Sequence, residues 1–280
     1  MGNGIAKARA KRGYTQKQLA ELIGCEALQI SKWERNWEEP PPATVRDIAL
    51  ALDTSAESVL GSTIPVEGWA DCPYAVGEHE PLFGGLHLKF THGEHSWPIS
   101  RRAYKSLTSQ LGDQEVDEQG GEGAWLYVWT LDDRLIFANP RYLRSLKLVD
   151  DDEAAAPDYE HPEVYRALID WDVRDDQTTG PLLKEACETY LREFEDEEEG
   201  ARPHLYLHIV YDDGSDEWVL FYDEWAATAF HALELNFSRV KRSAMQMVAY
   251  EGGSAQYVSL DRVALIEVPA QQYHRLTAPQ

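Results

Sequence analysis

The sequence YTQKQLAELIGCEALQISKWER, residues 14–35, decides the fold of the N-terminal part of this chain. Thr15 is a good N-cap, and the apolar residues after it recur at helical spacing. Gly24 predicts the end of that helix, because glycine adopts the left-handed C-terminal conformation without steric cost. A second helix follows over about residues 26–35. The stretch therefore predicts two short helices joined by a tight turn.

Three further helices are expected around this pair. A basic helix over residues 5–12 precedes it and ends before Gly13. The prolines at residues 40–42 interrupt the chain, and a fourth helix begins at Ala43 or Thr44. A last short helix is expected over residues 56–60. Five short helices within about 60 residues are typical of helix-turn-helix organisation.

These residues resemble the XRE family of helix-turn-helix domains, the type found in phage Cro and C1 repressors. The resemblance is carried by residues 14–24, by ISKWER at residues 30–35 and by IALAL at residues 48–52. It covers most of residues 5–60, about a fifth of the chain. It implies an all-α domain that binds double-stranded DNA, with the third helix in the major groove.

The resemblance also implies which side chains face DNA. Gln29 would pair with adenine, Lys32 with guanine, and Ala27 or Leu28 would contact thymine methyl groups. Gln16, at the start of the second helix, corresponds to the family's phosphate contact. The full set of expected DNA-binding residues is Arg12, Thr15, Gln16, Lys17, Glu26, Ala27, Leu28, Gln29, Lys32 and Arg35.

The sequence departs from the family pattern at two places. Cys25 and Glu26 occupy positions where the family has a Ser or Thr cap, and Asn36 replaces a glycine after the third helix. Glu26 could accept a hydrogen bond from cytosine or repel phosphate. Recognition by Ala27 and Leu28 would be mostly apolar and would discriminate bases weakly. The alternative is a helix-turn-helix retained only as a docking or dimerisation module.

Charge is distributed unevenly along this chain of net charge −23. Residues 1–62 hold equal numbers of basic and acidic residues, so the whole negative excess lies in residues 63–280. Within residues 1–35 seven basic residues face three acidic ones. The N-terminal end therefore suits a polyanionic partner, and the acidic remainder does not.

Residues 63–84 are expected to be a linker, and residues 85–280 an acidic α+β domain with a possible degenerate internal repeat. Four β-hairpins are expected from alternating apolar residues, with a last strand over residues 263–268. The paired strands are residues 86–90 with 97–99, 125–130 with 135–138, 205–211 with 218–222, and 245–250 with 256–260. Helices are expected over residues 101–111, 140–148, 182–194 and 224–235.

No catalytic motif appears in the acidic domain. The sequence lacks a phosphate loop, a dinucleotide-binding glycine signature and a zinc-protease motif, so no catalytic residue, cofactor or metal is assigned. Nine histidines invite a metal hypothesis. His92 and His95 are expected in a hairpin turn, and His204 and His208 on one face of a strand. Solvent-exposed histidine is the favoured interpretation.

Cysteine usage and hydropathy indicate the compartment. Cys25, Cys72 and Cys187 show neither paired nor metal-type spacing, as expected of reduced thiols. No apolar run is long enough to span a membrane or to act as a secretory signal. A cytoplasmic location is therefore expected.

The function expected is a sequence-specific transcriptional regulator, a repressor, with a C-terminal domain that dimerises or senses an effector. A homodimer or a higher homo-oligomer is expected, because such domains usually bind paired half-sites. The alternative is a protein-interaction module: an antitoxin, antirepressor or phage-encoded inhibitor that acts through the acidic domain. A third hypothesis, an enzyme under control of the DNA-binding head, has no supporting motif.

Overall fold

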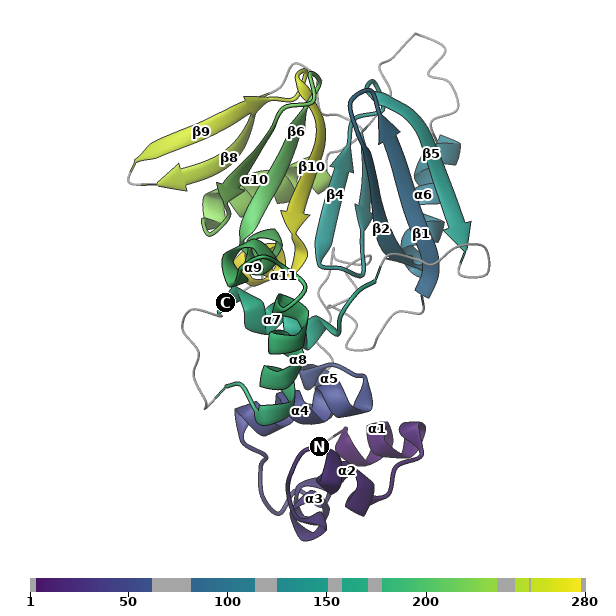
Figure 1. The fold of residues 1–280 in the computed structure, drawn as a ribbon, viewed down its shortest axis with the longest axis vertical. Helices are drawn as coiled ribbons and strands as arrows, with labels where there is room; N and C mark the ends of the chain where they lie inside the picture. Colours follow the sequence, from purple (N-terminus) through teal and green to yellow (C-terminus); the bar gives the residue numbers. More distant parts are fainter. Residues whose placement is uncertain are drawn as a thin grey trace. The chain divides into compact units, whose positions relative to one another are not determined.

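The computed structural model of this protein describes residues 4–61, 82–113, 125–150, 158–170, 178–235, 245–251 and 253–277. The chain divides into two compact units (Figure 1). The first combines residues 1–79 with residues 160–201, and the second combines residues 80–159 with residues 202–280. The expected linker at residues 63–84 lies almost wholly outside the described residues.

The first unit begins with five helices, as the sequence predicts. They are α1 (Ile5–Arg12), α2 (Gln16–Leu22), α3 (Ala27–Glu34), α4 (Pro42–Leu52) and α5 (Ala56–Leu60). Their inward faces form one core around Leu19, Ile30, Trp33 and Ile48. Because the apolar side chains recur every three or four residues, each short helix contributes one stripe to this core.

Local chemistry sets where these helices begin and end. Thr15 accepts a hydrogen bond from the Gln18 backbone N–H, and the Gln18 side chain accepts one from the Thr15 N–H. This capping box satisfies two N–H groups at the start of α2. Asn36 adopts a positive φ of 55°, the conformation expected where the family has glycine. The start of α2 and the exit from α3 are thus fixed locally.

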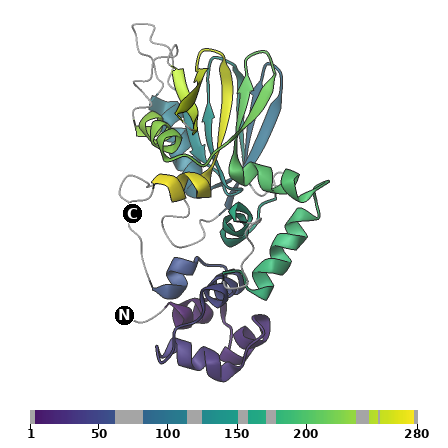
Figure 2. The same cartoon turned by 90° about the vertical axis from the view of Figure 1, so that its left-hand side faces the viewer.

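Two later helices, α7 (Pro162–Ile169) and α8 (Pro181–Leu191), complete the first unit. We call them the clasp. They form a buried cluster that includes Leu168 and Cys187, and Leu50 of α4 packs against it. Figures 1 and 2 both show α8 beside α4. The division expected at residues 62 and 85 stays a prediction, and the structure adds the clasp to the helix-turn-helix core.

The second unit is built on antiparallel strands. Sheet order is β2-β1-β5 in one sheet, β3-β4-β10-β6-β7 in a second and β8-β9 in a third. The strands are β1 (Leu82–Phe90), β2 (Glu94–Ser100), β3 (Leu126–Trp129), β4 (Arg134–Ala138), β5 (Leu143–Asp150), β6 (Tyr206–Tyr211), β7 (Asp216–Leu220), β8 (Met245–Glu251), β9 (Ser254–Ser259) and β10 (Val263–Pro269). All four expected hairpins are present as neighbouring antiparallel strands.

Helices pack on these sheets and share their core. They are α6 (Arg101–Asp113), α10 (Glu224–Leu235) and α11 (Ala270–Thr277), while α9 (Glu197–Leu205) contains the residues where the chain leaves the first unit. Residues of β1, β2, β3, β4, β10 and α6 form one buried cluster. An N-terminal helical region followed by an α+β region is the architecture the sequence predicts. In the described part of the chain, no helix has the length and apolar character needed to cross a membrane.

Two local expectations are wrong. Residues 140–148 do not form a helix, because residues 143–150 are strand β5 and pair with β1. The leucines of this segment fit helical spacing nearly as well as strand alternation, and the pairing partner is distant in sequence. His204 lies in α9, not on a strand with His208, because the helix continues through Pro203.

Candidate nucleic-acid interface

The N-terminal turn of α3 presents the side chains expected to face bases. Leu28 is 62% exposed, whereas Ala27 and Gln29 are half-buried at its flanks. Glu26 is the exposed N-cap residue, and its side chain makes no capping hydrogen bond. The Glu26 carbonyl oxygen accepts the Gln29 N–H at 2.9 Å, but its side chain leaves the start of α3 uncapped, where an anion can bind.

A single carboxylate joins the three helices that carry this surface. Glu34, at the end of α3, accepts hydrogen bonds from Arg9 Nε at 2.6 Å and from Gln16 Nε2 at 2.7 Å. Burial acts to raise the pKa of Glu34, but the hydrogen bonds from Arg9 and Gln16 and the Arg9 charge outweigh it and lower the pKa. Glu34 thus fixes α1 and α2 to α3 as an ionised group.

The two expected base-reading polar residues converge on Glu38. Gln29 Nε2 donates to Glu38 Oε2 at 2.7 Å, and Lys32 Nζ donates to Glu38 Oε1 at 2.8 Å. The hydrogen bonds from Lys32 and Gln29 lower the pKa of Glu38 below its ordinary value. In the free protein, the Glu38 carboxylate therefore accepts hydrogen bonds from Gln29 and Lys32, the two donors that the resemblance assigns to DNA bases.

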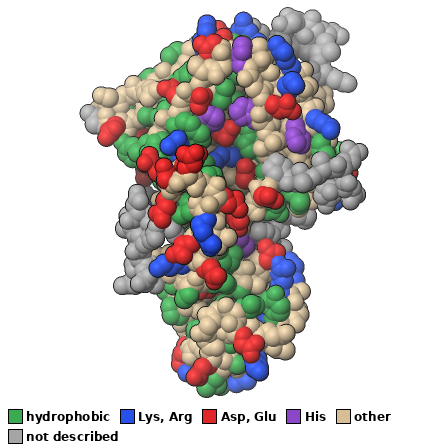
Figure 3. Space-filling view, in the orientation of Figure 1, with side chains coloured by type: hydrophobic (Ala, Val, Ile, Leu, Met, Phe, Trp, Pro, Cys, Tyr) green, Lys and Arg blue, Asp and Glu red, His purple; other side chains and the backbone are tan. Residues whose placement is uncertain are grey.

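An aromatic side chain lies beside the same surface. The Arg35 guanidinium lies 4.9 Å from the ring centroid of Trp37, a cation–π contact. Trp37 is 66% exposed. Its ring orders the Arg35 side chain and leaves an apolar group at the edge of α3. Figure 3 shows side chains of both signs on this end of the first unit.

Other expected contacts have different surroundings. Arg12 donates to the Leu52 carbonyl oxygen at 3.0 Å and pairs with Asp53, so it ties α1 to the end of α4. Lys17 is 80% exposed and lies 3.6 Å from Glu21 on the same helix. Thr15 is exposed and serves as the cap of α2. Their contacts with DNA stay predictions.

The structure therefore groups Gln29 and Lys32 with two residues that the sequence did not single out. Trp37 and Glu38 lie in the loop after α3 and carry no motif. A Glu followed by a second Glu in a loop is most simply a solvated acidic pair, and no local signal shows that it reaches back to α3. The side-chain contact across six residues is visible only in three dimensions.

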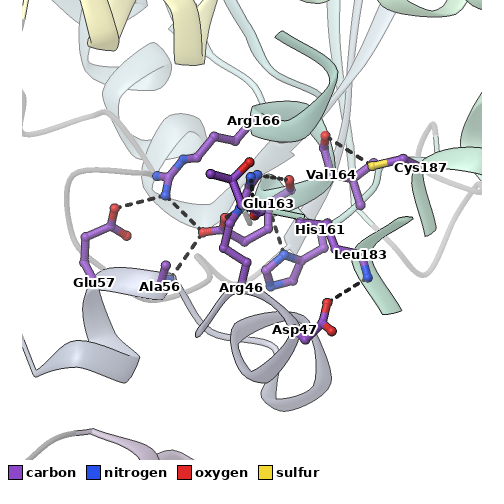
Figure 4. Close-up of polar contacts among 11 residues, drawn as sticks. Arg46, Asp47, Ala56, Glu57, His161, Glu163, Val164, Arg166, Leu183 and Cys187 are labelled. Atoms are coloured by element: carbon purple, nitrogen blue, oxygen red, sulfur yellow. Dashed lines mark hydrogen bonds and ion pairs between the residues drawn. The ribbon is translucent and has the colours of Figure 1, made fainter. Parts of the chain in front are cut away.

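The clasp holds α4 and α5 through Glu163 (Figure 4). The Glu163 carboxylate pairs with Arg46 Nε at 2.9 Å and with Arg166 at 3.1 Å. It also accepts from the Ala56 N–H at 3.3 Å. Ala56 is the first residue of α5, so Glu163 supplies a charge at a helix N-terminus. The Glu163 side chain is 1% exposed, so this network is buried.

Asp47 makes the reciprocal contact from α4 to the clasp. Its Oδ1 accepts from the Leu183 N–H at 2.9 Å, in the first turn of α8. The N-cap of α8 is Gly180, which has no side chain, so Asp47 caps this helix from another element. A Cβ atom at Gly180 would lie 2.2 Å from Asp47 Oδ2. Glycine is therefore needed where α8 approaches α4.

A second polar cluster lies within the second unit. His95 Nδ1 and His208 Nδ1 lie 3.7 Å and 3.5 Å from Glu267 Oε1. Burial acts to lower the pKa of His208, but Glu267 and Asp216 outweigh it and raise the pKa. A cavity of about 250 Å³ opens beside these groups. It is lined by residues that include His92, His95, Tyr142, His208, Tyr211 and Asp216.

This cluster is an ion-paired network. Arg134 Nε lies 3.5 Å from Glu267 Oε2, and His208 Nε2 lies 3.0 Å from Asp216 Oδ2. Among the described residues, no three His, Cys, Asp or Glu side chains are arranged as a metal site. His204, the fourth histidine singled out in the sequence, is buried and bonded to Asp133 at 2.7 Å. His95 and His208 therefore connect strands of this unit, and His204 connects α9 to the residue before β4.

The comparisons with known proteins concern the first unit. Residues 5–59 match a family model described as helix-turn-helix. Over 61 residues the chain is 31% identical to the HTH-type transcriptional regulator ImmR of Bacillus subtilis (strain 168). The aligned segment is 22% of this chain and 48% of that protein. The match thus spans about half of the relative's length. No solved structure matches the chain. Residues 5–59 therefore form a helix-turn-helix domain, as their resemblance to the XRE family predicts.

Proposed function

We propose that this protein is a DNA-binding transcriptional regulator, a repressor that binds its operator as a homodimer. One observation carries the proposal: an XRE-family domain presents the N-terminal turn of α3, with Leu28 exposed and Gln29 and Lys32 beside it. Side chains at this end of a recognition helix reach base edges in the major groove. Gln29 and Lys32 are donors suited to adenine and guanine.

The network around Glu34 supports this assignment. DNA reading requires that α2 and α3 keep a fixed angle, so that phosphate and base contacts form together. Glu34 provides that rigidity, because Arg9, Gln16 and Glu34 come from three different helices. Gln16, the first residue of α2, is half-buried and held by Glu34, at the position where the resemblance implies a phosphate contact.

The second unit is proposed to dimerise and to sense an effector. The chain passes from the second unit into the clasp at residue 160 and returns to the second unit after residue 201. The polypeptide therefore joins the two units at both ends of the clasp. A change in the second unit could therefore reach α4 through Arg46 and Glu163. The cavity beside His95 and His208 is the candidate effector site.

The test is a gel-shift and footprinting experiment on the full-length chain, with DNA from upstream of its own gene and with selected random duplexes. We expect a specific complex with two-fold symmetric protection of half-sites one helical turn apart. The complex should weaken as salt rises, because Lys and Arg contacts release counterions. Absence of specific binding to any selected duplex would overturn the proposal.

A further inference from the structure

Hairpin β8–β9 of the second unit has one buried face and one exposed face. Gln246, Val248 and Val258 are buried, and α10 packs against β8. The strand register pairs Met245 with Ser259, Met247 with Tyr257, and Tyr250 with Ala255. Directly opposed residues share a face, and Ala255, Tyr257 and Ser259 alternate along β9. These six residues therefore form the opposite face, which we call the hairpin face.

A bulge assembles this face. The register shifts between Met247 and Ala249, so that Tyr250 lies on the same side as Met245 and Met247 instead of on the side of Val248. Without the shift, Tyr250 would alternate to the buried side. The bulge thus brings a second tyrosine to the exposed surface. Figure 3 shows hydrophobic side chains over the region of this hairpin.

The hairpin face has the composition of an interface core. Met245 is 58% exposed and Tyr257 is 52% exposed, and none of the six side chains is charged. Trp225 of α10, 69% exposed, extends this surface, since its ring centroid lies 6.4 Å from that of Tyr250. Exposed Tyr, Trp and Met without charges are the signature of the buried centre of protein–protein interfaces.

We propose that the hairpin face is the surface through which two copies of this chain associate, face to face about a two-fold axis. This inference rests on the proposed function, which requires a homodimer, and it identifies the surface through which the homodimer forms. The four large exposed side chains offer an apolar area on the order of 500 Å² per copy. Two copies would bury about 1,000 Å², which reaches the lower limit of a specific interface.

Charge favours a second copy over nucleic acid or a basic protein. With a net charge of −23, two copies repel each other at most of their surface, so they associate where charge is absent. The hairpin face offers neither Lys nor Arg to a phosphate backbone, nor a carboxylate to a basic partner. A two-fold axis makes such a patch its own complement, since each residue meets the same patch on the other copy.

The test uses light scattering on the full-length chain over a concentration series. We expect a dimer mass for the wild type and a monomer for Met245→Glu and Tyr257→Glu, with the dimer Kd raised about 30-fold or more, as for central interface residues. Gln256→Glu is the matched control, because Gln256 is an exposed residue next to Tyr257 that lies on the other face of β9 and receives the same charge. This control should remain a dimer.

Two further measurements keep the result interpretable. A photo-crosslinking amino acid in place of Ala255 should crosslink two copies of the chain, whereas the same amino acid in place of Gln256 should not. This measurement does not depend on whether the glutamate variants fold. Added salt should tighten the dimer, because it screens repulsion between acidic copies, while it weakens DNA binding. A monomeric wild type, or dimers in both glutamate variants, would overturn the inference; a dimer without DNA binding would overturn only the proposed function.

Discussion

The ammonium nitrogen of Lys32 lies 2.8 Å from Oε1 of Glu38, in a loop that follows the recognition helix. The other oxygen of the same carboxylate holds Gln29. DNA that uses these donors must displace Glu38, and the intramolecular contact therefore competes with the operator. Because the pair is partly exposed, the competition is modest in energy.

Glu38→Gln is expected to raise operator affinity by about 3- to 10-fold, because a neutral amide with one acceptor oxygen competes less for Lys32 and Gln29 and does not repel phosphate. The salt dependence should steepen, since Lys32 becomes free to replace a counterion. Quantitative gel shifts at several salt concentrations measure both effects. Glu39→Gln is the matched control, with the same charge removed from the next residue; equal gains in both variants would show that only net charge matters.

Alanine at Gln29 or Lys32 is expected to reduce affinity for the selected operator by about 1–3 kcal/mol and to relax the preference at one base pair each. Lys17→Ala should instead weaken binding to all duplexes alike, because Lys17 is an exposed cation on α2. Selection from random duplexes with each variant separates the two behaviours. An unchanged base preference in both the Gln29 and the Lys32 variants would contradict their assignment to base reading.

The ionised Glu34 makes the helix-turn-helix core sensitive to acid. Its folded-state pKa lies below the ordinary value of 4.5, so its stabilising effect is present above that pH and is lost as the pH falls through the folded pKa. Glu34→Gln should therefore melt at a lower temperature than the wild type at neutral pH, and the difference should shrink in acid. A difference that is constant across this pH range would show that Glu34 acts through packing alone.

Removal of the Glu163 side chain should open the clasp. Glu163→Ala leaves Arg46, Arg166 and the Ala56 N–H without their shared acceptor, at an expected cost of about 2–4 kcal/mol. Hydrogen exchange of peptides from α4 and α5 measures this loss. Glu57→Ala, which removes only the outer partner of Arg166, should cost about 1 kcal/mol or less. Equal protection in the two variants would contradict a central role for Glu163.

Gly180 provides an independent test of the same contact. Gly180→Ala would place a Cβ atom 2.2 Å from Asp47 Oδ2 and should destabilise the clasp by about 1–3 kcal/mol. In Gly112→Ala a Cβ atom meets nothing within 4 Å, and this change in helix α6 should be neutral or mildly stabilising. Thermal melts of both variants give the comparison. Equal melting temperatures would show that α8 can shift away from Asp47.

Much of the helix-turn-helix core could be predicted from local sequence. Caps, glycines and apolar stripes act within a few residues, so α1 and α5 begin and end at the expected residues and α2 to α4 within one or two. What was missed depends on distant partners. Strand β5 is specified by pairing with β1, and α7 by packing on α4, whose Arg46 is 117 residues from Glu163. A single sequence does not show which distant segments meet.

At the candidate site, too, the sequence predicted local positions but not contacts that depend on the path of the chain. The positions of Gln29 and Lys32 on the outward side of α3 follow from helical periodicity and from the family resemblance. Their engagement by Glu38 does not, because it depends on the path of the loop after Asn36. His204 shows the converse case: its type and spacing to His208 suggested a shared face, yet the helix through Pro203 buries it beside Asp133.

The discontinuous first unit has a consequence for synthesis of the chain. Glu163 follows Arg46 by 117 residues, a distance that a ribosome covers in about 6–23 s. During that interval the nascent chain already contains every residue of the DNA-reading helices, while the groups that cover α4 have not been made. Translation that stops before residue 160 would thus release helices α1 to α5 in a form where Arg46 has no Glu163 and Asp47 no Leu183 N–H to pair with.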